Sequence, residues 1–330
     1  MDILLSGKKF ETIADPRLVI AVLEPRCNLK CSHCYWNHDG IDYGKRTHDW
    51  SRQIEKIVSW NADVAYAGRI LTPRAAEFIK EYCERSGKKV GIVDNGYTIL
   101  SHPELFKYYE YVNISLDGVP EDHDRQRNKK GSFEIALAAI RKMNRIAEER
   151  QDEVSREALR PVVSATFSPL NIDQWEQFEG LLTKENIAMS CNPVLGVQEN
   201  FNRNMPLFDA EGIREAFKKV VGGMPKLINL YDPKHVEPLL PLLKRYDWTI
   251  RQEGDALRTE LENGTVIVYK PLSVQTFGER TLLWTGNFHA DADVADAKFA
   301  ETATEKHLLA VANRFADAER RLVQTLLKRK

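Results

Sequence analysis

The chain has few cysteines, no long apolar run and almost no excess of charge, and each shortage excludes a class of protein. With five cysteines in 330 residues, it lacks the pattern of a disulfide framework, and a reducing compartment would keep its thiols free. No apolar segment reaches the roughly 20 residues that span a bilayer, and the apolar stretch at the N-terminus is too short for a signal peptide. We therefore expect a cytoplasmic protein that is not inserted in a membrane.

Charge and composition point to an ordinary globular protein. The formal net charge of -1 gives no reason to expect nucleic acid or an anionic membrane as partner. Hydrophobic residues make up 43% of the chain and charged residues 29%, which is typical of soluble proteins. The length allows one large α/β domain or a domain with an appendage. No internal repeat or low-complexity tract is present.

Three of the five cysteines are clustered. Cys27, Cys31 and Cys34 follow one another at C-x3-C-x2-C spacing. Because iron–sulfur clusters are normally held by four thiolates, three can bind a cube at three corners and leave one iron open for chemistry. A structural zinc site is the alternative, because His33 and His38 are available as a fourth ligand. The spacing alone leaves both kinds of site possible.

The position of the cysteines favours the iron–sulfur interpretation. Residues 18–23 form an apolar run of strand length that ends at Glu24-Pro25, just before the cysteines begin. In βα architectures the loops after the carboxyl ends of strands carry the chemistry, whereas zinc knuckles more often form small independent modules. The remaining cysteines, Cys83 and Cys191, are interpreted as buried small apolar residues.

Strand patterns then alternate with helix patterns. We expect strands at residues 18–23, 63–67, 89–93, 111–116, 161–167 and 187–194. We expect helices at residues 49–60, 73–85, 133–149 and 173–182, and a short one capped by residues 101–103. This alternation predicts a parallel sheet with right-handed crossovers, and six units leave a barrel unclosed.

The run Cys27-Asn-Leu-Lys-Cys-Ser-His-Cys-Tyr-Trp36 after a first strand resembles the radical S-adenosylmethionine (radical SAM) enzymes. The resemblance covers roughly residues 17–196 and implies an α/β fold, a partial (βα)6 barrel with a C-terminal α+β extension. It also implies a [4Fe-4S] cluster whose open iron is chelated by S-adenosyl-L-methionine. In that family reductive cleavage of this cofactor gives a 5′-deoxyadenosyl radical that removes a hydrogen atom from substrate.

Further positions match the family at strand ends. The resemblance implies cofactor contacts by Gly68 and Asn95, by the flat ring of His33 near the adenine, and by Asn192 on the adenine side. Arg69 stands where the family usually has a glutamate that approaches the cofactor's amino group. A cation cannot accept a hydrogen bond from an ammonium group, so this departure puts the usual contact in doubt.

The strongest secondary match is Ile114-Ser-Leu-Asp-Gly118 followed by His123-Asp-Arg-Gln-Arg127, a run shared with peptide- and sulfatase-modifying radical enzymes. It implies that Ser115 contacts the cofactor's ribose or carboxylate and that Asp117 faces the reacting centre as a catalytic residue. Arg127 can pair with a carboxylate, because its planar fork matches one bidentately. A solvated loop before a helix is the alternative for Arg127.

The resemblance fades beyond about residue 200, so we expect a radical SAM core at 1–200 and a separate extension at 201–330. In the extension we predict helices at 209–221 and 235–246, a hairpin of 256–261 with 266–269, a strand at 280–284, and an amphipathic helix at 291–330. Many relatives have auxiliary clusters in a C-terminal module, but no cysteine follows Cys191. The hairpin is similar to the first hairpin of that module without its ligands.

These features predict a radical SAM enzyme with one cluster, which leans toward modification of a peptide or protein side chain. A small metabolite, sugar or nucleoside undergoing dehydration, dehydrogenation or rearrangement is the alternative substrate. A non-catalytic iron–sulfur or zinc-binding partner protein is a third interpretation, motivated by Arg69. An electron donor such as flavodoxin or ferredoxin is the expected protein partner.

Overall fold

A computed structural model describes residues 18–21, 27–34, 51–67, 73–150, 159–195, 205–231, 233–239, 251–253, 256–269 and 281–284. The strands within these residues form one eleven-stranded sheet in the order β11-β1-β2-β3-β4-β5-β6-β7-β10-β9-β8. Their bounds are β1 Leu18–Ala21, β2 Asp63–Ala67, β3 Val90–Asp94, β4 Tyr109–Ser115, β5 Val162–Phe167, β6 Ala188–Pro193, β7 Leu227–Leu230, β8 Arg251–Glu253, β9 Ala256–Glu260, β10 Val266–Tyr269 and β11 Thr281–Trp284.

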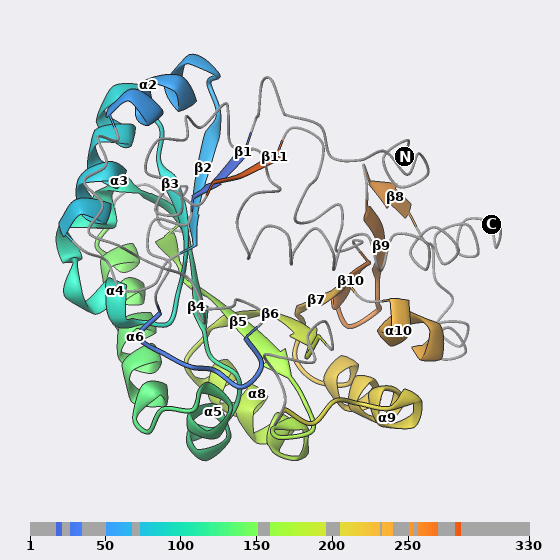
Figure 1. Ribbon diagram of the computed structural model, residues 1–330. Helices are drawn as coiled ribbons and strands as arrows, with labels where there is room; N and C mark the ends of the chain where they lie inside the picture. The colour runs from blue at the N-terminus through green and yellow to red at the C-terminus, as the bar shows by residue number, and fades with distance from the viewer. Residues whose placement is uncertain are drawn as a thin grey trace.

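The first seven strands are parallel neighbours in chain order, which is the arrangement that the alternating pattern predicts. Strands β11 and β8 are the two edges of the described sheet, so the sheet stays open. It curves with its helices on the outer side (Figure 1). The fold class, a partial barrel of α/β type, is therefore confirmed.

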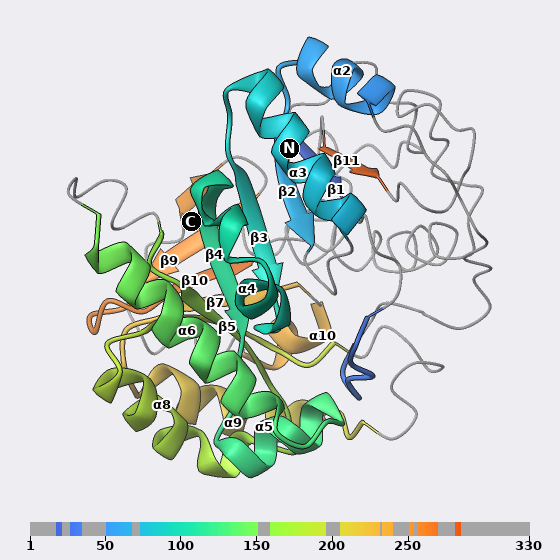
Figure 2. The ribbon, with the colours of Figure 1, turned by 90° about the vertical axis from the view of Figure 1, so that its left-hand side faces the viewer.

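The described helices lie along the outside of this curved sheet, and α3, α4 and α6 cover the strands in the view of Figure 2. The helices are α2 Ser51–Ser59, α3 Pro73–Ser86, α4 Tyr97–Ser101, α5 Pro120–Arg127, α6 Ser132–Glu148, α8 Trp175–Lys184, α9 Ala210–Val221 and α10 Pro233–Val236. The 3-10 helices are η1 Pro103–Tyr108, η2 Ile172–Gln174 and η3 Glu237–Leu239.

The core lies between the sheet and this helical layer. On β5, the residues Val163, Ala165 and Phe167 are fully buried and alternate with half-buried Ser164 and Thr166. Because successive side chains of a strand point to opposite faces, the apolar residues of β5 face the helices and the polar ones face the other side of the sheet. We call that opposite side the open face of the sheet.

The predicted elements of the first 200 residues are present to within a few residues, but α4 and α5 were not predicted. Residues 120–127 form a helix with Arg127 as its last residue, which replaces the solvated loop considered above. In the C-terminal part the predicted hairpin is confirmed as the antiparallel pair β9 and β10. It turns at Asn263-Gly264, where Gly264 has φ 80°.

The hairpin and the strand at 281–284 belong to the same sheet as the core, because β10 pairs with β7 and β11 pairs with β1. Of the predicted helix at 235–246, residues 240–246 lie outside the described residues, as does the whole helix at 291–330. No helix in the described ranges is both long and apolar enough to cross a membrane.

Candidate functional site

Residues 27–34, here called the cysteine loop, follow β1 and are held by the ends of two other strands. At the end of β3, Asn95 Nδ2 donates to Asn28 Oδ1 at 2.8 Å and points at Cys27 Sγ at 3.9 Å. The backbone N–H of Leu29 donates to the same sulfur at 3.4 Å. The predicted cofactor residue Asn95 therefore directs its amide hydrogens to the cysteine loop.

Helix α5 fixes the other half of the cysteine loop, which lies beside it in Figures 1 and 2. Ser32 donates twice to the Gln126 carbonyl, through its N–H at 3.0 Å and its hydroxyl at 2.8 Å. The Gln126 side chain is itself buried and bonds the end of β5, donating to the Thr166 carbonyl at 2.8 Å and accepting from Ser168 Oγ at 2.6 Å. A chain of hydrogen bonds thus joins the cysteine loop to the sheet.

The residues from His123 to Arg127, which match the family, make hydrogen bonds to neighbouring parts of the site. His123 Nδ1 accepts from the Asp117 N–H at 3.0 Å, and burial lowers the pKa of His123 to about 4, which keeps it neutral as an acceptor. Asp124 accepts from the N–H groups of Gly131 at 2.5 Å and Phe133 at 2.8 Å. Asp124 therefore caps the N-terminus of α6.

Asp117 and Arg127 form a buried ion pair at the centre of the site. Arg127 Nε donates to Asp117 Oδ2 at 2.5 Å, and the Thr166 N–H donates to Oδ1 at 2.9 Å. Asp117 is fully buried and Arg127 is 9% exposed. Burial alone would raise the pKa of Asp117, but the Arg127 charge holds it below its usual value. Arg127 Nη1 also points at Cys31 Sγ at 3.9 Å, so the pair touches the cysteine loop.

His33 lies on the other side of the same carboxylate. Its Nε2 is 3.9 Å from Asp117 Oδ2, and its side chain is 10% exposed. Burial lowers the pKa of His33 to about 4 although the Asp117 charge opposes this, so His33 is neutral at physiological pH. Its Nδ1 is buried without a hydrogen-bond partner.

The cysteine loop has the donor chemistry of an iron–sulfur site. Burial raises the pKa of Cys31 to about 12, and the charges of Cys34 and Cys27 act in the same direction while Arg127 opposes them. Such thiols ionise when iron provides the positive charge. Two buried polar atoms of this loop, Asn28 Nδ2 and His33 Nδ1, have no partner.

The three cysteines are thiolate donors of the kind that a [4Fe-4S] cluster takes, one at each of three irons, so the donor set fits such a cluster. Within the described ranges, no three His, Cys, Asp or Glu side chains converge as a site for one metal ion. The possible zinc ligand His38 lies outside the described residues.

Of the other predicted cofactor residues, Ser115 and Asn192 lie on strands of the sheet, and Gly68 lies outside the described residues. Ser115 ends β4 and is half-buried, and Asn192 is half-buried on β6, where its Nδ2 donates to the Pro193 carbonyl at 3.0 Å. Both are on the open face. Gly68 and Arg69 lie outside the described residues, so the departure at Arg69 has no structural account.

Several residues that hold the site were not singled out from the sequence. They include Asn28 and Ser32 in the cysteine loop, Gln126 in α5, and Asn171, whose Nδ2 donates to the carbonyls of Asp117 and Thr166. Their positions in the sequence were the available signal: Asn28 and Ser32 stand between the cysteines, and Gln126 stands directly before Arg127.

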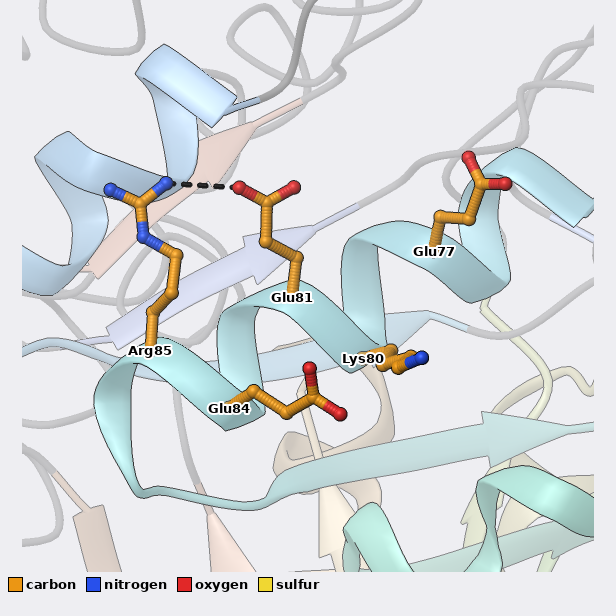
Figure 3. Close-up of a pocket in the computed structure, with 5 residues that line it drawn as sticks. All are labelled: Glu77, Lys80, Glu81, Glu84 and Arg85. Carbon is orange, nitrogen blue, oxygen red and sulfur yellow. Dashed lines mark hydrogen bonds and ion pairs between the residues drawn. The ribbon is translucent and has the colours of Figure 1, made fainter.

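A surface hollow on α3 is separate from this site. It is lined by side chains of that one helix, namely Glu77, Lys80, Glu81, Glu84 and Arg85 (Figure 3). Arg85 Nη1 donates to Glu81 Oε1 at 2.9 Å, and Glu84 accepts from the Tyr108 hydroxyl at 2.8 Å. These charges pair locally, as on an ordinary solvated helix face.

The parallel α/β sheet and the cysteine loop at the end of β1 define the class of protein. Residues 22–147 match the family model of the Radical SAM superfamily. This part of the chain is similar to the Radical SAM domain, and members of that superfamily are enzymes that use a [4Fe-4S] cluster and S-adenosyl-L-methionine.

Individual relatives match parts of the chain. It is 28% identical over 182 residues to Fe-coproporphyrin III synthase of Methanosarcina barkeri (strain Fusaro / DSM 804), covering 53% of this chain and 43% of that protein. It is 33% identical over 135 residues to the antilisterial bacteriocin subtilosin biosynthesis protein AlbA of Bacillus subtilis (strain 168), covering 36% of this chain and 28% of AlbA. The matched part is therefore less than half the length of these relatives.

A solved structure supports the fold alone. Streptococcus suis SuiB, crystallised with its precursor peptide SuiA, is similar with a TM-score of 0.51 at 13% identity. The similarity covers 76% of this chain and 55% of SuiB.

Proposed function

We propose that the chain is a radical SAM enzyme with a single cluster on Cys27, Cys31 and Cys34 that modifies a peptide or protein side chain. When bound, the cluster and S-adenosyl-L-methionine supply the one-electron cleavage that gives a 5′-deoxyadenosyl radical, which takes a hydrogen atom from substrate. The observation that carries the proposal is the cysteine loop, which the ends of β3 and β5 and helix α5 hold in place.

The chain's own residues bind and orient the cofactor in this proposal. Arg127 uses Nε and Nη1 for Asp117 and Cys31, while its Nη2 makes no hydrogen bond to a described residue and is left for the cofactor's carboxylate. Ser115 offers a hydroxyl, and the neutral His33 ring offers a flat surface for the adenine. Asn192 and Gly68 complete the proposed contacts. Asp117 acts through Arg127, because its described contacts are with protein groups.

The open face of the sheet supports a peptide as substrate. Ser115 on β4, Ser164 on β5 and Ser190 on β6 are register partners across three strands. Asn229 on β7 donates through Nδ2 to Ser190 Oγ at 2.8 Å. In this bond Ser190 accepts, so its O–H can still donate to a substrate, and Asn229 Oδ1 can still accept from one. Neither group is bonded to a described residue. A neighbouring donor and acceptor without charge match the C=O and N–H groups of an amide.

A small molecule that carries carboxylates is the second candidate, favoured by the similarity to Fe-coproporphyrin III synthase. Arg258 on β9 is the residue that supports it. Its register partner is Val268 on β10, which in turn pairs with Asn229, and directly paired residues share a face of the sheet. A cation on the open face would suit a carboxylate of such a substrate.

The proposal includes an electron donor, a reducing compartment and two parts of the chain. A flavodoxin or ferredoxin would supply the electron, and a reducing cytoplasm would keep the cysteines free for iron. Residues 1–200 would form the catalytic core and 201–330 an extension that shapes the substrate side through β7, β9 and β10.

Two reciprocal variants test the substrate class. The anaerobically reconstituted enzyme, with about four irons per chain, is incubated with S-adenosyl-L-methionine, dithionite and candidate precursor peptides encoded nearby, and peptide masses are measured. We expect a change in peptide mass. Asn229→Ala should lower the rate of this modification at least tenfold, in line with the loss of about one substrate hydrogen bond, and Arg258→Ala should leave the rate within twofold of the wild type. No peptide mass change, together with conversion of a carboxylate-bearing metabolite that Arg258→Ala abolishes, would favour the second candidate.

A further inference from the structure

We propose that the buried Asp117–Arg127 pair sets the reduction potential of the cluster, with Arg127 raising it and Asp117 moderating that effect. The proposal rests on the proposed function in that it requires a cluster on the cysteine loop. It concerns a property that neither the family match nor the fold assigns to these two residues.

The Arg127 guanidinium of this pair contacts the cysteine loop. The guanidinium contacts both groups: Nη1 points at Cys31 Sγ at 3.9 Å, and Nε binds Asp117 Oδ2 at 2.5 Å. The cation is therefore in contact with a ligand sulfur, and the carboxylate is bound through the cation. Hydrogen bonds to the sulfurs, nearby charge and solvent exposure are the properties that set the potential of an iron–sulfur cluster.

Burial makes the two charges effective and the surrounding groups keep them in place. Asp117 is fully buried and Arg127 is 9% exposed, so water screens their fields only weakly. The Thr166 N–H holds Asp117 Oδ1 at 2.9 Å. On its other side, Asp117 Oδ2 lies 3.9 Å from His33 Nε2.

The sign of each effect follows from the charge that reduction adds. One electron from an external donor lowers the charge of the cluster by one, so a neighbouring cation stabilises the reduced form and raises the potential. A neighbouring carboxylate does the opposite. Removing the charge of Asp117 should therefore shift the midpoint potential to a more positive value, and removing that of Arg127 should shift it to a more negative value.

The test is an anaerobic redox titration with dithionite, followed by electron paramagnetic resonance of the reduced cluster in the full-length reconstituted protein. The variants are Asp117→Asn, Arg127→Gln, Arg127→Lys and the double variant Asp117→Asn with Arg127→Gln. Arg141→Gln is the matched control, because Arg141 binds Glu185 at the surface, where the Arg141 side chain is 54% exposed. The titration needs no substrate and no turnover.

We expect opposite shifts for Asp117→Asn and Arg127→Gln, a value between them for the double variant, and no shift for Arg141→Gln. A purely structural role would move both single variants in the same direction or leave both at the control value, and either outcome would overturn the proposal. If Arg127→Gln does not bind iron, Asp117→Asn must still shift to a more positive value while Arg127→Lys stays near the wild type. Absence of a cluster signal in the loaded wild type would instead contradict the proposed function.

Discussion

At the scale of single residues, the site is built by side chains that each serve two partners. Asn95 bonds Asn28 and points at Cys27, and Arg127 bonds Asp117 and points at Cys31. Each such side chain connects a strand or helix end to the cysteine loop. A substitution at one of these positions therefore changes both the loop and the element that carries the side chain.

Asp94, the residue before Asn95, gives a prediction about pH. It is 1% exposed, its Oδ1 accepts from the N–H groups of Gly96 and Thr98, and its Oδ2 has no partner. Burial raises the pKa of Asp94 from 3.8 to about 6. A raised pKa in the folded state means that the carboxyl costs stability once it ionises, so stability is lost as the pH rises from about 4 through 6.

The test measures the free energy of unfolding of Asp94→Asn and of the wild type in urea between pH 4 and pH 8. Relative to the wild type, the variant should gain about 3 kcal/mol in free energy of unfolding over this range, since one pKa unit corresponds to about 1.4 kcal/mol. Parallel pH profiles of the two proteins would contradict the raised pKa.

At the scale of elements, helices α5 and α6 depend on one carboxylate. Asp124 accepts from Gly131 and Phe133 N–H and from Ser132 Oγ, and thereby caps α6 from α5. Burial is the largest single effect and opposes ionisation, but the hydrogen bonds together outweigh it and lower the pKa of Asp124. Its contribution is therefore present above its ordinary pKa and lost as the pH falls.

Asp124→Ala should cost about 1–3 kcal/mol of stability at pH 7, because it leaves two helix N–H groups without their acceptor. Asp124→Asn should cost less, since an amide oxygen still accepts. Glu134→Ala, at an exposed position in the first turn of α6, is the control and should cost under about 1 kcal/mol. Equal losses for Asp124→Ala and Glu134→Ala in thermal unfolding would contradict the capping role.

A second buried ion pair joins α8 to β7. Lys226 Nζ lies 2.9 Å from Glu179 Oε1, and the Lys226 side chain is fully buried. Glu179 also accepts from Trp175 Nε1 at 2.6 Å and from the Met224 N–H at 2.9 Å. These contacts hold the strand that adds Asn229 to the open face.

Lys226→Met should destabilise the protein by about 3–5 kcal/mol, because it leaves a buried carboxylate without its cation. Adding Glu179→Gln to this variant should recover part of the loss, since the amide is neutral and still accepts from Trp175 or Met224. Chemical unfolding measures both. A double variant that is less stable than Lys226→Met alone would show that the charge of Glu179 is not the cause.

At the scale of the whole molecule, the sequence predicted the parallel part of the fold well, because strands such as β1, β3 and β5 are largely apolar runs. The strands at 63–67 and 162–167 agree with prediction almost residue by residue. It did not predict α5, whose residues 120–127 are nearly all polar and lack an apolar face. That helix forms because its polar side chains are buried against Asp117, Thr166 and the start of α6.

The candidate site was predicted where chemistry is local in sequence and missed where it depends on distant contacts. The three cysteines and the pairing ability of Arg127 follow from residue type and spacing. That Arg127 binds Asp117, ten residues away, and reaches Cys31, 96 residues away, follows from the packing of α5 against the cysteine loop. Gln126 joins strand and loop by the same packing, and its residue type alone gives no sign of this.

The central claim, radical chemistry at the cysteine loop, is tested most directly by 5′-deoxyadenosine formation under anaerobic conditions. The reconstituted protein receives S-adenosyl-L-methionine and dithionite, with and without candidate substrate, beside Cys31→Ala and the matched control Cys83→Ala in α3. The account predicts product from the wild type and Cys83→Ala and none from Cys31→Ala. No product from a wild type that holds four irons and is supplied with substrate, or equal product from Cys31→Ala, would contradict it.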